Sequence, residues 1–433
     1  MVIIGDGPGG YEGALVARQL GADVTLVSAG QIGGSAVLTD CVPSKTLIAT
    51  SEAIDQAAAS GYLGVRIDGR PADRSAFSVD LATVNERILE LAHAQSAGIR
   101  QHLEQAGVEI VHGRGTLTSE ATIEVTNDDA SWDVAADTIL FATGARPRVL
   151  AEATPDGERI LSWEQIYQLD ELPEHLIVVG SGVTGAEFAS AFHALGSTVT
   201  LVSSRDRVLP GEDVDAAAVL EDVFTRRGLN VRSRSRAVAA RRVDDSVIVT
   251  LDDSSTLQGS HVLMAVGSLP NTDDLGLESA GVSTDSRGFI TVDRVSRTSA
   301  RHIYAAGDCT GVNMLASVAA MQGRIAMYHA LGDAVAPLES TAISSTIFTE
   351  PEIATVGLQQ ADLDSGSFRG TTVLLPLRTN ARAKMHGHHD GFVKLFARKG
   401  SQIVAGGVVV APNASELIHS ITLAVDNRLT VDQ

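Results

Sequence analysis

The chain has 433 residues, a formal net charge of −20 and 44% hydrophobic residues. This length and hydrophobic content predict two or three domains with sizeable cores, and they exclude a disordered chain. The negative charge argues against nucleic acid or an anionic membrane surface as a partner, because both would repel the protein.

The cysteine content and the hydropathy indicate where in the cell the protein is expected. The only cysteines are Cys41 and Cys309, so we expect no disulfide framework of the secreted type. No apolar run reaches the roughly 18 residues of a membrane span. The sequence opens directly on Val2-Ile3-Ile4-Gly5 without a signal-peptide pattern. We therefore expect a cytoplasmic protein without a membrane span.

One sequence pattern occurs twice. The run Val-Ile-Ile-Gly-Asp-Gly-Pro-Gly-Gly at 2–10 is repeated as Ile-Val-Val-Gly-Ser-Gly-Val-Thr-Gly at 177–185. Each copy is followed by a helical stretch (11–20 and 186–195) and then by a short β run (24–27 and 199–202). This order predicts two βαβ units, each with a parallel sheet.

The remaining elements follow in chain order. Apolar residues recur at helical spacing over 80–105, and short strands are expected at 108–111 and within 116–134. The run at 138–145 closes the first unit, 155–173 is expected to be a linker and a helix, and 261–270 repeats the closing pattern. After the linker 332–337, strands are expected at 343–348, 371–376, 391–396 and 403–410, followed by a helix from Ser415.

The glycines of both fingerprints predict dinucleotide binding. In a GxGxxG turn, the first glycine allows the tight turn, the second lets the backbone approach a pyrophosphate, and the third lets helix and strand pack closely. The N-terminus of the following helix then supplies N–H donors and a partial positive charge. Two copies, each between a strand and a helix, are much stronger evidence than one.

The acidic residue that usually follows at the end of the next strand, where it binds a ribose hydroxyl, is absent from both units. Ser28 and Ser203 stand there instead. In the second unit this loss removes repulsion against a 2′-phosphate, and Arg205 and Arg207 are close enough in sequence to pair with one, so we expect NADPH to be accepted. In the first unit Ser28 can still hydrogen-bond a ribose, although more weakly than a carboxylate would.

Several further motifs carry a family resemblance. They are Cys-Val-Pro-Ser-Lys at 41–45, Ala-Thr-Gly-Ala at 142–145, Gly-Ser-Leu-Pro-Asn at 267–271, Ile-Tyr-Ala-Ala-Gly-Asp at 303–308 and Phe-Thr-Glu-Pro-Glu-Ile-Ala at 348–354. Together with the fingerprints, and in this order, they resemble the pyridine nucleotide–disulfide oxidoreductases, the flavoprotein family of dihydrolipoamide dehydrogenase, glutathione reductase and mercuric reductase. The resemblance runs through essentially the whole chain.

The resemblance implies an α/β fold with two Rossmann-like domains, which bind FAD and NAD(P)H, and a C-terminal α+β dimerisation domain. The FAD domain is expected at 1–148 and 268–337, the NAD(P)H domain at 149–267, and the dimerisation domain at 338–433. A homodimer is expected. The FAD residues it implies are Gly5, Gly7, Gly10, Ser28, Gly34, Lys45, Ala142, Thr143, Gly144, Asp308, Leu315 and Ala316. The NAD(P)H residues it implies are Gly180, Gly182, Val183, Gly185, Ser203, Arg205 and Gly267.

The resemblance also implies catalytic residues, namely Lys45, Glu187 and Cys41. Lys45 is expected to pair with Glu187 beside flavin N5, where an ammonium stabilises the negative charge of reduced flavin. Asp308 is expected to bind the ribityl chain. The helix that begins at Leu315 and Ala316 is expected to direct its N-terminal dipole at the flavin N1–O2 edge.

Two departures from the family pattern bear on the activity. The disulfide reductases carry a Cys-x4-Cys pair, but Ala36 stands where the first cysteine would be, and the single thiol of Cys41 cannot store an electron pair as an internal disulfide. Cys309 lies in another segment, next to the ribityl aspartate, and is interpreted as structural. In addition, the sequence ends at Gln433, before the position of the family's His-Glu pair, which is either lacking or lies beyond this chain.

These departures favour the branch of lipoamide-dehydrogenase-like NAD(P)H:quinone reductases that has lost the dithiol. The expected activity is hydride transfer from NADPH or NADH to FAD, followed by direct electron transfer to a quinone-like acceptor, without lipoamide dehydrogenase or disulfide reductase activity. Two alternatives stay open: a disulfide or peroxide reductase that uses Cys41 alone, and an inactive flavoprotein scaffold.

The His386-Gly-His388-His389-Asp390 cluster has no recognised zinc spacing, so no metal is expected.

Overall fold

The computed structural model describes residues 1–433, and the chain divides into two compact units. The first comprises 1–44, 87–148 and 268–339, and the second comprises 45–86, 149–267 and 340–433. Two helices contribute residues to both units: α3 (Cys41–Ala59) and α4 (Leu81–Gln105). None of the helices has the combination of length and apolar character that a membrane span needs.

The first unit is built on a five-stranded parallel sheet in the order β20-β9-β1-β2-β5. Its strands are β1 (Val2–Ile4), β2 (Thr25–Ser28), β5 (Glu109–His112), β9 (Ile139–Phe141) and β20 (Ile303–Ala305). Three of them (β1, β9 and β20) are buried throughout, as expected for a parallel sheet covered on both faces. The predicted βαβ order at 2–28 is confirmed, with the first strand in the middle of the sheet.

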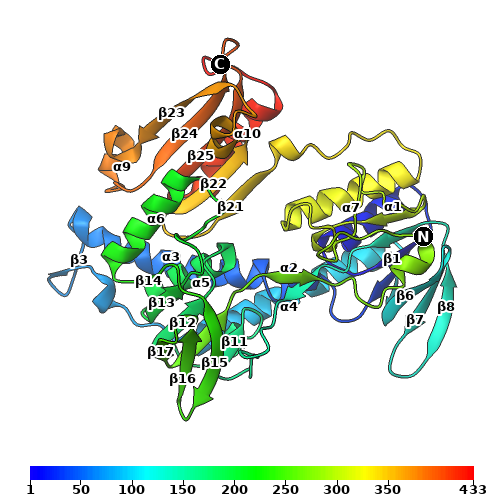
Figure 1. The fold of residues 1–433 in the computed structure, drawn as a ribbon, viewed down its shortest axis with the longest axis horizontal. Helices are drawn as coiled ribbons and strands as arrows, with labels where there is room; N and C mark the ends of the chain where they lie inside the picture. The colour runs from blue at the N-terminus through cyan, green and yellow to red at the C-terminus, as the bar shows by residue number, and fades with distance from the viewer. The chain divides into compact units, whose positions relative to one another are not determined.

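Helices α1 (Pro8–Gln19) and α7 (Ala316–Ala330) pack side by side in this unit (Figure 1). Their contact is close because Gly9 and Gly323 face each other: a Cβ on Gly323 would lie 2.0 Å from the Gly9 carbonyl oxygen. The unit also holds the antiparallel sheet of β6 (Arg114–Ser119), β7 (Thr122–Thr126) and β8 (Ser131–Ala135), and the pair of β10 (Ala145–Pro147) and β19 (Ser268–Pro270).

The second unit repeats this sheet, in the order β11-β18-β12-β13-β14. Its strands are β11 (Ile160–Ser162), β12 (His175–Val179), β13 (Thr198–Val202), β14 (Asn230–Arg232) and β18 (His261–Met264). Helices α5 (Val183–Leu195) and α6 (Val214–Arg227) accompany it, with the antiparallel sheet of β15 (Ala237–Val243), β16 (Ser246–Leu251) and β17 (Thr256–Gly259). The strand before each glycine turn, β1 or β12, therefore holds the same central position in its sheet.

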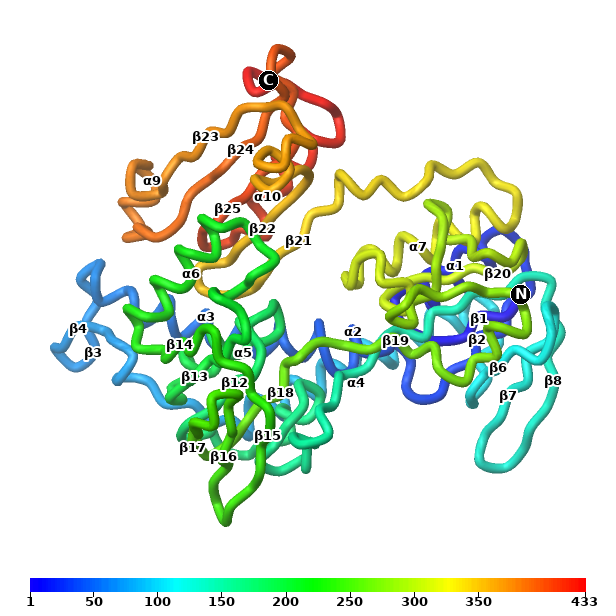
Figure 2. Tube along the Cα trace, viewed as in Figure 1, coloured from blue at the N-terminus to red at the C-terminus, as the bar shows by residue number.

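The C-terminal part of the second unit is a five-stranded antiparallel sheet in the order β21-β22-β25-β24-β23, traced from yellow-orange to red in Figure 2. Its strands are β21 (Ser344–Ile347), β22 (Glu352–Gly357), β23 (Gly370–Pro376), β24 (Phe392–Arg398) and β25 (Val404–Ala411), and α10 (Ala414–Asp426) packs on β22 and β25. The interior strand β22, which lies between β21 and β25, falls outside the predicted strands. The remaining α-helices and β-strands are short: α2 (Gly34–Leu38), β3 (Arg66–Ile67), β4 (Arg70–Pro71), α8 (Gln360–Asp364) and α9 (Ala381–Met385).

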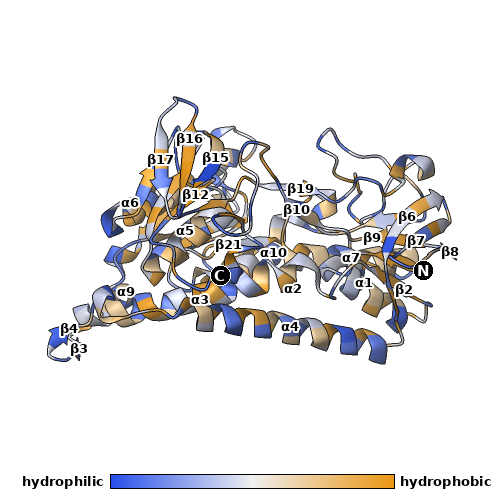
Figure 3. Ribbon diagram, turned by 90° about the horizontal axis from the view of Figure 1, so that it is seen from below, coloured by the Kyte–Doolittle hydropathy of each residue, from blue (hydrophilic) through white to orange (hydrophobic).

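Two helical predictions had different outcomes. The predicted helix at 80–105 is confirmed as α4, on which Leu81, Ile88 and Leu103 are at most 2% exposed, and Figure 3 shows its mixture of apolar and polar residues. The helix predicted within 155–173 is wrong, because that segment forms the short strand β11 and a single 3₁₀ turn at Ile166–Gln168. A three-residue strand is too short to show a period of two in the sequence.

A buried lysine links the C-terminal sheet to α6. Lys394, on β24, lies 2.9 Å from Asp213 and 2.8 Å from Asp215, and the Lys394 and Asp213 side chains are 3% and 0% exposed. Asp213 also caps α6 by accepting the N–H groups of Asp215 and Ala216. The charge of Lys394 therefore compensates a fully buried carboxylate at a helix start.

The histidine cluster has structural contacts. Asp390 pairs with Arg226 at 2.7 Å, His389 lies edge-on to Tyr62, and the rings of His386 and His388 are stacked. The carboxylate of the cluster is thus engaged by an arginine.

We predict that Lys394→Met destabilises the protein by roughly 3 kcal/mol, because it leaves Asp213 buried without its counter-charge. Urea denaturation followed by circular dichroism measures this effect, and Lys399→Met, at an exposed position, is the matched control. Equal unfolding midpoints for Lys394→Met and the control would contradict the prediction.

Candidate functional site

The glycine turn of the first unit leaves one stretch of backbone open. A Cβ on Gly10 would lie 1.9 Å from the Gly5 carbonyl oxygen, and one on Gly5 would lie 2.2 Å from that of Ala142. A Cβ on Gly7, in contrast, would meet only the Cα of Gly34, at 3.9 Å. The first and third glycines are therefore required by packing, whereas the middle one leaves the backbone accessible to a pyrophosphate.

The second unit has the same arrangement. A Cβ on Gly185 would lie 1.8 Å from the Gly180 oxygen, one on Gly180 would lie 2.1 Å from the Ala265 oxygen, and one on Gly182 would meet nothing within 4 Å. Helix α5 begins at Val183, directly after this turn. Both turns thus fit a dinucleotide pyrophosphate at a helix N-terminus.

The loop at 142–144 is fixed to the segment around Asn271. The Thr143 hydroxyl donates to the Asn271 carbonyl at 2.7 Å, and the Asn271 side-chain amide donates to the Thr143 carbonyl at 3.0 Å. Gly144 follows with a φ of +68°, and Gly267 has a φ of +92° at the corresponding point of the second unit. Ala142, Thr143 and Gly144 therefore form a rigid rim after β9 in the first unit.

The loop that carries Asp308 is held by a hydrogen bond to a side chain of α7. Gln322, which is 1% exposed, accepts the Gly307 N–H at 2.8 Å. Burial raises the pKa of Asp308 to about 6, and the charge of Asp40 adds to the effect. A partly buried carboxylate of this kind fits a hydroxyl donor such as the ribityl chain of FAD. Leu315 occupies the N-cap position of α7 without a side-chain hydrogen bond, and the helix begins at Ala316 as predicted.

The predicted pair of Lys45 and Glu187 is present. Lys45 Nζ donates to Glu187 Oε2 at 2.8 Å, and the two side chains are 35% and 6% exposed. The second oxygen, Oε1, accepts the backbone N–H of Phe348 at 2.9 Å, and Lys45 Nζ lies 4.9 Å from the centre of the Phe348 ring. Both oxygens of the buried Glu187 carboxylate are thus engaged: one accepts from the partly exposed Lys45 ammonium group, and the other accepts from the Phe348 N–H.

The two cysteines differ in environment. Cys41 is the first residue of α3 and is partly buried, while Ala36 lies in the preceding helix, α2. Cys309 is fully buried, its thiol donates to the Ala306 carbonyl at 3.3 Å, and burial raises the pKa of the thiol to about 11. Cys309 is therefore a structural residue, and Ala36 provides no thiol beside Cys41.

The serines at the strand ends are engaged locally. Ser28 is 1% exposed and donates to the Asp6 carboxylate, and Ser203 is fully buried and accepts from the Ser181 hydroxyl at 2.7 Å. Arg205 is exposed, whereas Arg207 is partly buried and donates to the Pro210 carbonyl at 3.4 Å. Of the two arginines, Arg205 is thus the better placed to meet a ligand.

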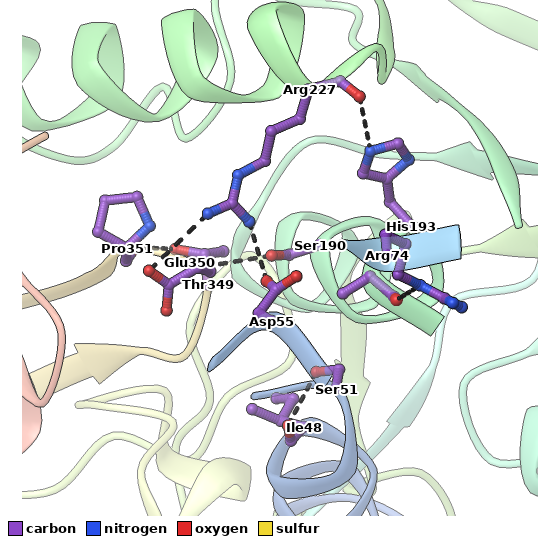
Figure 4. Close-up of polar contacts among 11 residues, drawn as sticks. Ile48, Ser51, Asp55, Arg74, Ser190, His193, Arg227, Thr349, Glu350 and Pro351 are labelled. Carbon is purple, nitrogen blue, oxygen red and sulfur yellow. Dashed lines mark hydrogen bonds and ion pairs between the residues drawn. The ribbon is translucent and has the colours of Figure 1, made fainter. Parts of the chain in front are cut away.

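The segment that carries Phe348 is anchored by polar contacts (Figure 4). The Glu350 N–H donates to the Ser190 hydroxyl at 3.2 Å, and Arg227 lies between Asp55, at 2.9 Å, and Glu350, at 4.0 Å. Burial raises the pKa of Glu350 to about 7; the charge of Arg227 opposes this shift, and the charges of Asp55, Glu52 and Glu352 reinforce it. Anchoring this segment also fixes the Phe348 N–H that holds Glu187.

Sequence reasoning missed three residues of these sites. Asp6 lies within the first fingerprint, and a charged residue inside a phosphate-binding turn is a signal that could have marked it. Phe348 acts partly through its backbone N–H, which has no signature in the sequence, and Gln322 acts from a helix interior.

Comparison with known proteins gives two family matches. Residues 1–323 match the model of the pyridine nucleotide-disulphide oxidoreductases, and residues 343–433 match the dimerisation domain of the same family.

Among curated proteins, an NAD(P)H dehydrogenase (quinone) of Mycobacterium tuberculosis is 51% identical over the whole chain, which covers 89% of that protein. A dihydrolipoyl dehydrogenase of Chlamydia muridarum is 32% identical over 99% of the chain and 91% of its own length. The crystal structure of LpdA from Mycobacterium tuberculosis matches the fold with a TM-score of 0.92 at 50% identity, over 100% of this chain and 94% of that one. The flavoprotein disulfide reductase RclA of Escherichia coli shares the fold, with a TM-score of 0.86 at 23% identity. The match covers 99% of this chain and 93% of RclA.

We predict that Glu350 makes stability depend on pH. Its pKa is about 7 in the folded protein against an ordinary 4.5, so the folded protein holds this proton more tightly than the unfolded chain. The stabilisation by the protonated carboxyl is complete below about pH 4.5 and is lost as the pH rises through about 7. Glu350→Gln should therefore raise the stability at pH 8 by roughly 1 kcal/mol and flatten the dependence between pH 5 and pH 8.

Thermal unfolding of the wild-type protein, Glu350→Gln and Glu171→Gln at both pH values measures this effect. Glu171 is exposed and serves as the control. A Glu350→Gln curve parallel to that of the wild type would show that the prediction is wrong.

Proposed function

Because the chain belongs to the pyridine nucleotide-disulphide oxidoreductase family, we propose that it is an FAD-dependent NAD(P)H:quinone oxidoreductase of the diaphorase type. One observation carries the proposal: both dinucleotide turns and the Lys45–Glu187 pair are intact, while Ala36 replaces the first redox cysteine. The name of the 51% identical relative, an NAD(P)H dehydrogenase (quinone), supports it.

FAD and NAD(P)H are the cofactors of this family. When bound, FAD supplies the two-electron chemistry, taking a hydride from NAD(P)H and passing the electrons to the acceptor. In the first unit we assign FAD binding to the open backbone at Gly7, to the rim at 142–144 and to Asp308, with Gln322 positioning the Asp308 loop. In the second unit the open backbone at Gly182 and the N-terminus of α5 would hold NAD(P)H.

Lys45 is assigned the role of counter-charge. Its ammonium is held by a carboxylate whose other oxygen is occupied by the Phe348 N–H, so Glu187 cannot turn away from it without losing a backbone hydrogen bond. A fixed positive charge stabilises negative charge that develops during two-electron reduction, and it needs no reorganisation to do so. Glu187 and Phe348 are positioning residues for this charge.

The replacement at position 36 sets the class of acceptor. A disulfide relay needs two thiols, and Ala36 leaves only Cys41 in the segment where the family carries its pair. We therefore propose that electrons pass directly to a quinone-like molecule and that the protein has no lipoamide dehydrogenase or disulfide reductase activity. Cys41 is not required for this reaction.

The second unit favours acceptance of NADPH. No carboxylate stands at position 203 or in the contacting position 181, and Arg205 is exposed nearby. A 2′-phosphate would thus meet an arginine rather than a negative charge. Comparison of kcat/KM for NADPH and NADH tests this proposal, which fails if NADH is preferred by tenfold or more.

The domain division and the oligomer are also proposals. We place the FAD domain at 1–148 and 268–337, the NAD(P)H domain at 149–267 and the dimerisation domain at 338–433.

The family match of the last segment supports a homodimer. Light scattering checks it, and a monomer at micromolar concentration would count against it. The cytoplasmic location stays a prediction.

The experiment that tests the function is turnover of the Cys41→Ser variant. We predict that it keeps quinone reduction by NADPH within about twofold of the wild type, since the reaction does not pass through a thiol. Lys45→Met is the contrasting variant and should lose roughly tenfold in kcat or more, because the counter-charge is gone.

The outcomes separate the alternatives. Loss of turnover in Cys41→Ser would favour a single-cysteine reductase. Absence of turnover in the wild-type protein despite bound FAD would favour a scaffold.

A further inference from the structure

The same contact occurs in both fingerprints. The residue between the first two glycines touches the residue at the end of the following strand: Asp6 accepts from Ser28 in the first unit, and Ser181 donates to Ser203 at 2.7 Å in the second. The two positions therefore form a matched pair in each repeat. The first pair carries a carboxylate and the second does not.

The Ser28 hydroxyl is already used in a hydrogen bond to the Asp6 carboxylate. Its side chain is buried, and its hydroxyl contacts Asp6 Oδ2 and the Gly30 carbonyl, the latter at 3.1 Å. Its own lone pairs face the Gly30 N–H at 3.4 Å. Direct recognition of a ligand by Ser28 would break these contacts.

Asp6, in contrast, is partly exposed. Its Oδ1 lies beside the loop at 33–34, where a Cβ built on Gly34 would be 3.7 Å away. Burial raises the pKa of Asp6, whereas the Ser28 hydroxyl and the backbone N–H groups of Gly34, Gly33 and Asp6 itself oppose that shift. A ligand hydroxyl would donate a further hydrogen bond to the partly desolvated Asp6 carboxylate.

A dinucleotide-binding unit ordinarily places a carboxylate at the end of its second strand, where it accepts the 2′-hydroxyl of the adenosine ribose. Here that strand ends in Ser28, and the hydrogen bond from Ser28 brings the Asp6 carboxylate to the strand end from the neighbouring turn. We infer that Asp6 is the residue of the first unit that binds the ribose of FAD, with Ser28 as its positioning residue. This inference rests on the proposed binding of FAD to that unit.

The pairing also explains how an acid can stand within a phosphate-binding turn. The Asp6 side chain is bonded to Ser28 and lies beside the loop at 33–34, while the open backbone for the pyrophosphate is at Gly7. The carboxylate is thus directed at the sugar, and its charge excludes a 2′-phosphate from the first unit. The Ser181–Ser203 pair imposes no such exclusion on the second unit.

The test uses apoprotein and two probes, ADP and 2′-deoxy-ADP, each titrated as a competitor of FAD so that only the FAD site is read. Flavin fluorescence reports the displacement. The variant is Asp6→Ser, which gives the first turn the serine pair that already exists in the second. We expect the wild type to bind ADP about tenfold more tightly than 2′-deoxy-ADP, and Asp6→Ser to bind both with nearly equal affinity. Ser181→Ala, in the second unit, is the control and should keep the wild-type ratio.

The ratio of the two affinities separates recognition from a structural role. If Asp6 only shaped the loop, Asp6→Ser would weaken both probes alike and leave the ratio unchanged, which would overturn the inference. A wild-type ratio near one would overturn it as well. Should Asp6→Ser not fold, the isosteric Asp6→Asn takes its place, with an expected ratio of about threefold or less. A wild-type apoprotein that fails to bind FAD would overturn the proposed function and this inference together.

Discussion

Much of the second unit's candidate chemistry depends on one buried carboxylate, that of Glu187. It lies on α5, directly after the glycine turn, and holds both the ammonium of Lys45, on α3, and the backbone of Phe348, just before β22. A carboxylate this deeply buried is stable only if both oxygens are satisfied, so these three distant segments must come together for it to be accommodated. The same constraint that stabilises this region therefore also fixes the charge assigned to catalysis.

The two dinucleotide units show how one scaffold is specialised by a pair of positions. Their glycines serve the same purposes, since the first and third are enforced by packing and the middle one is open in both. They differ at the contact between turn and strand end, where one unit has Asp6 with Ser28 and the other has Ser181 with Ser203. A single carboxylate thus distinguishes a site that should demand a free ribose hydroxyl from one that can accept a phosphate there.

The sequence predicts the repeated βαβ order and the glycine turns well, because hydrophobic periodicity and turn chemistry are local. It does not reveal β11, whose three residues carry no period, or the backbone bond of Phe348. Lys45 and Glu187 are 142 residues apart, so their pairing could be expected only from the family resemblance. The contact of Asp6 with Ser28 could not be predicted for a related reason: the two residues are 22 positions apart, and the fold brings them together.

In the proposed reaction, electrons pass from FAD to the acceptor without a disulfide. Anaerobic titration of the FAD-loaded protein with NADPH, followed by flavin absorbance and by the NADPH consumed, is the decisive test. We expect bleaching to be complete after one electron pair per FAD, with no further NADPH oxidised. Uptake of a second electron pair per FAD would reveal a redox-active disulfide and would contradict direct electron transfer from FAD.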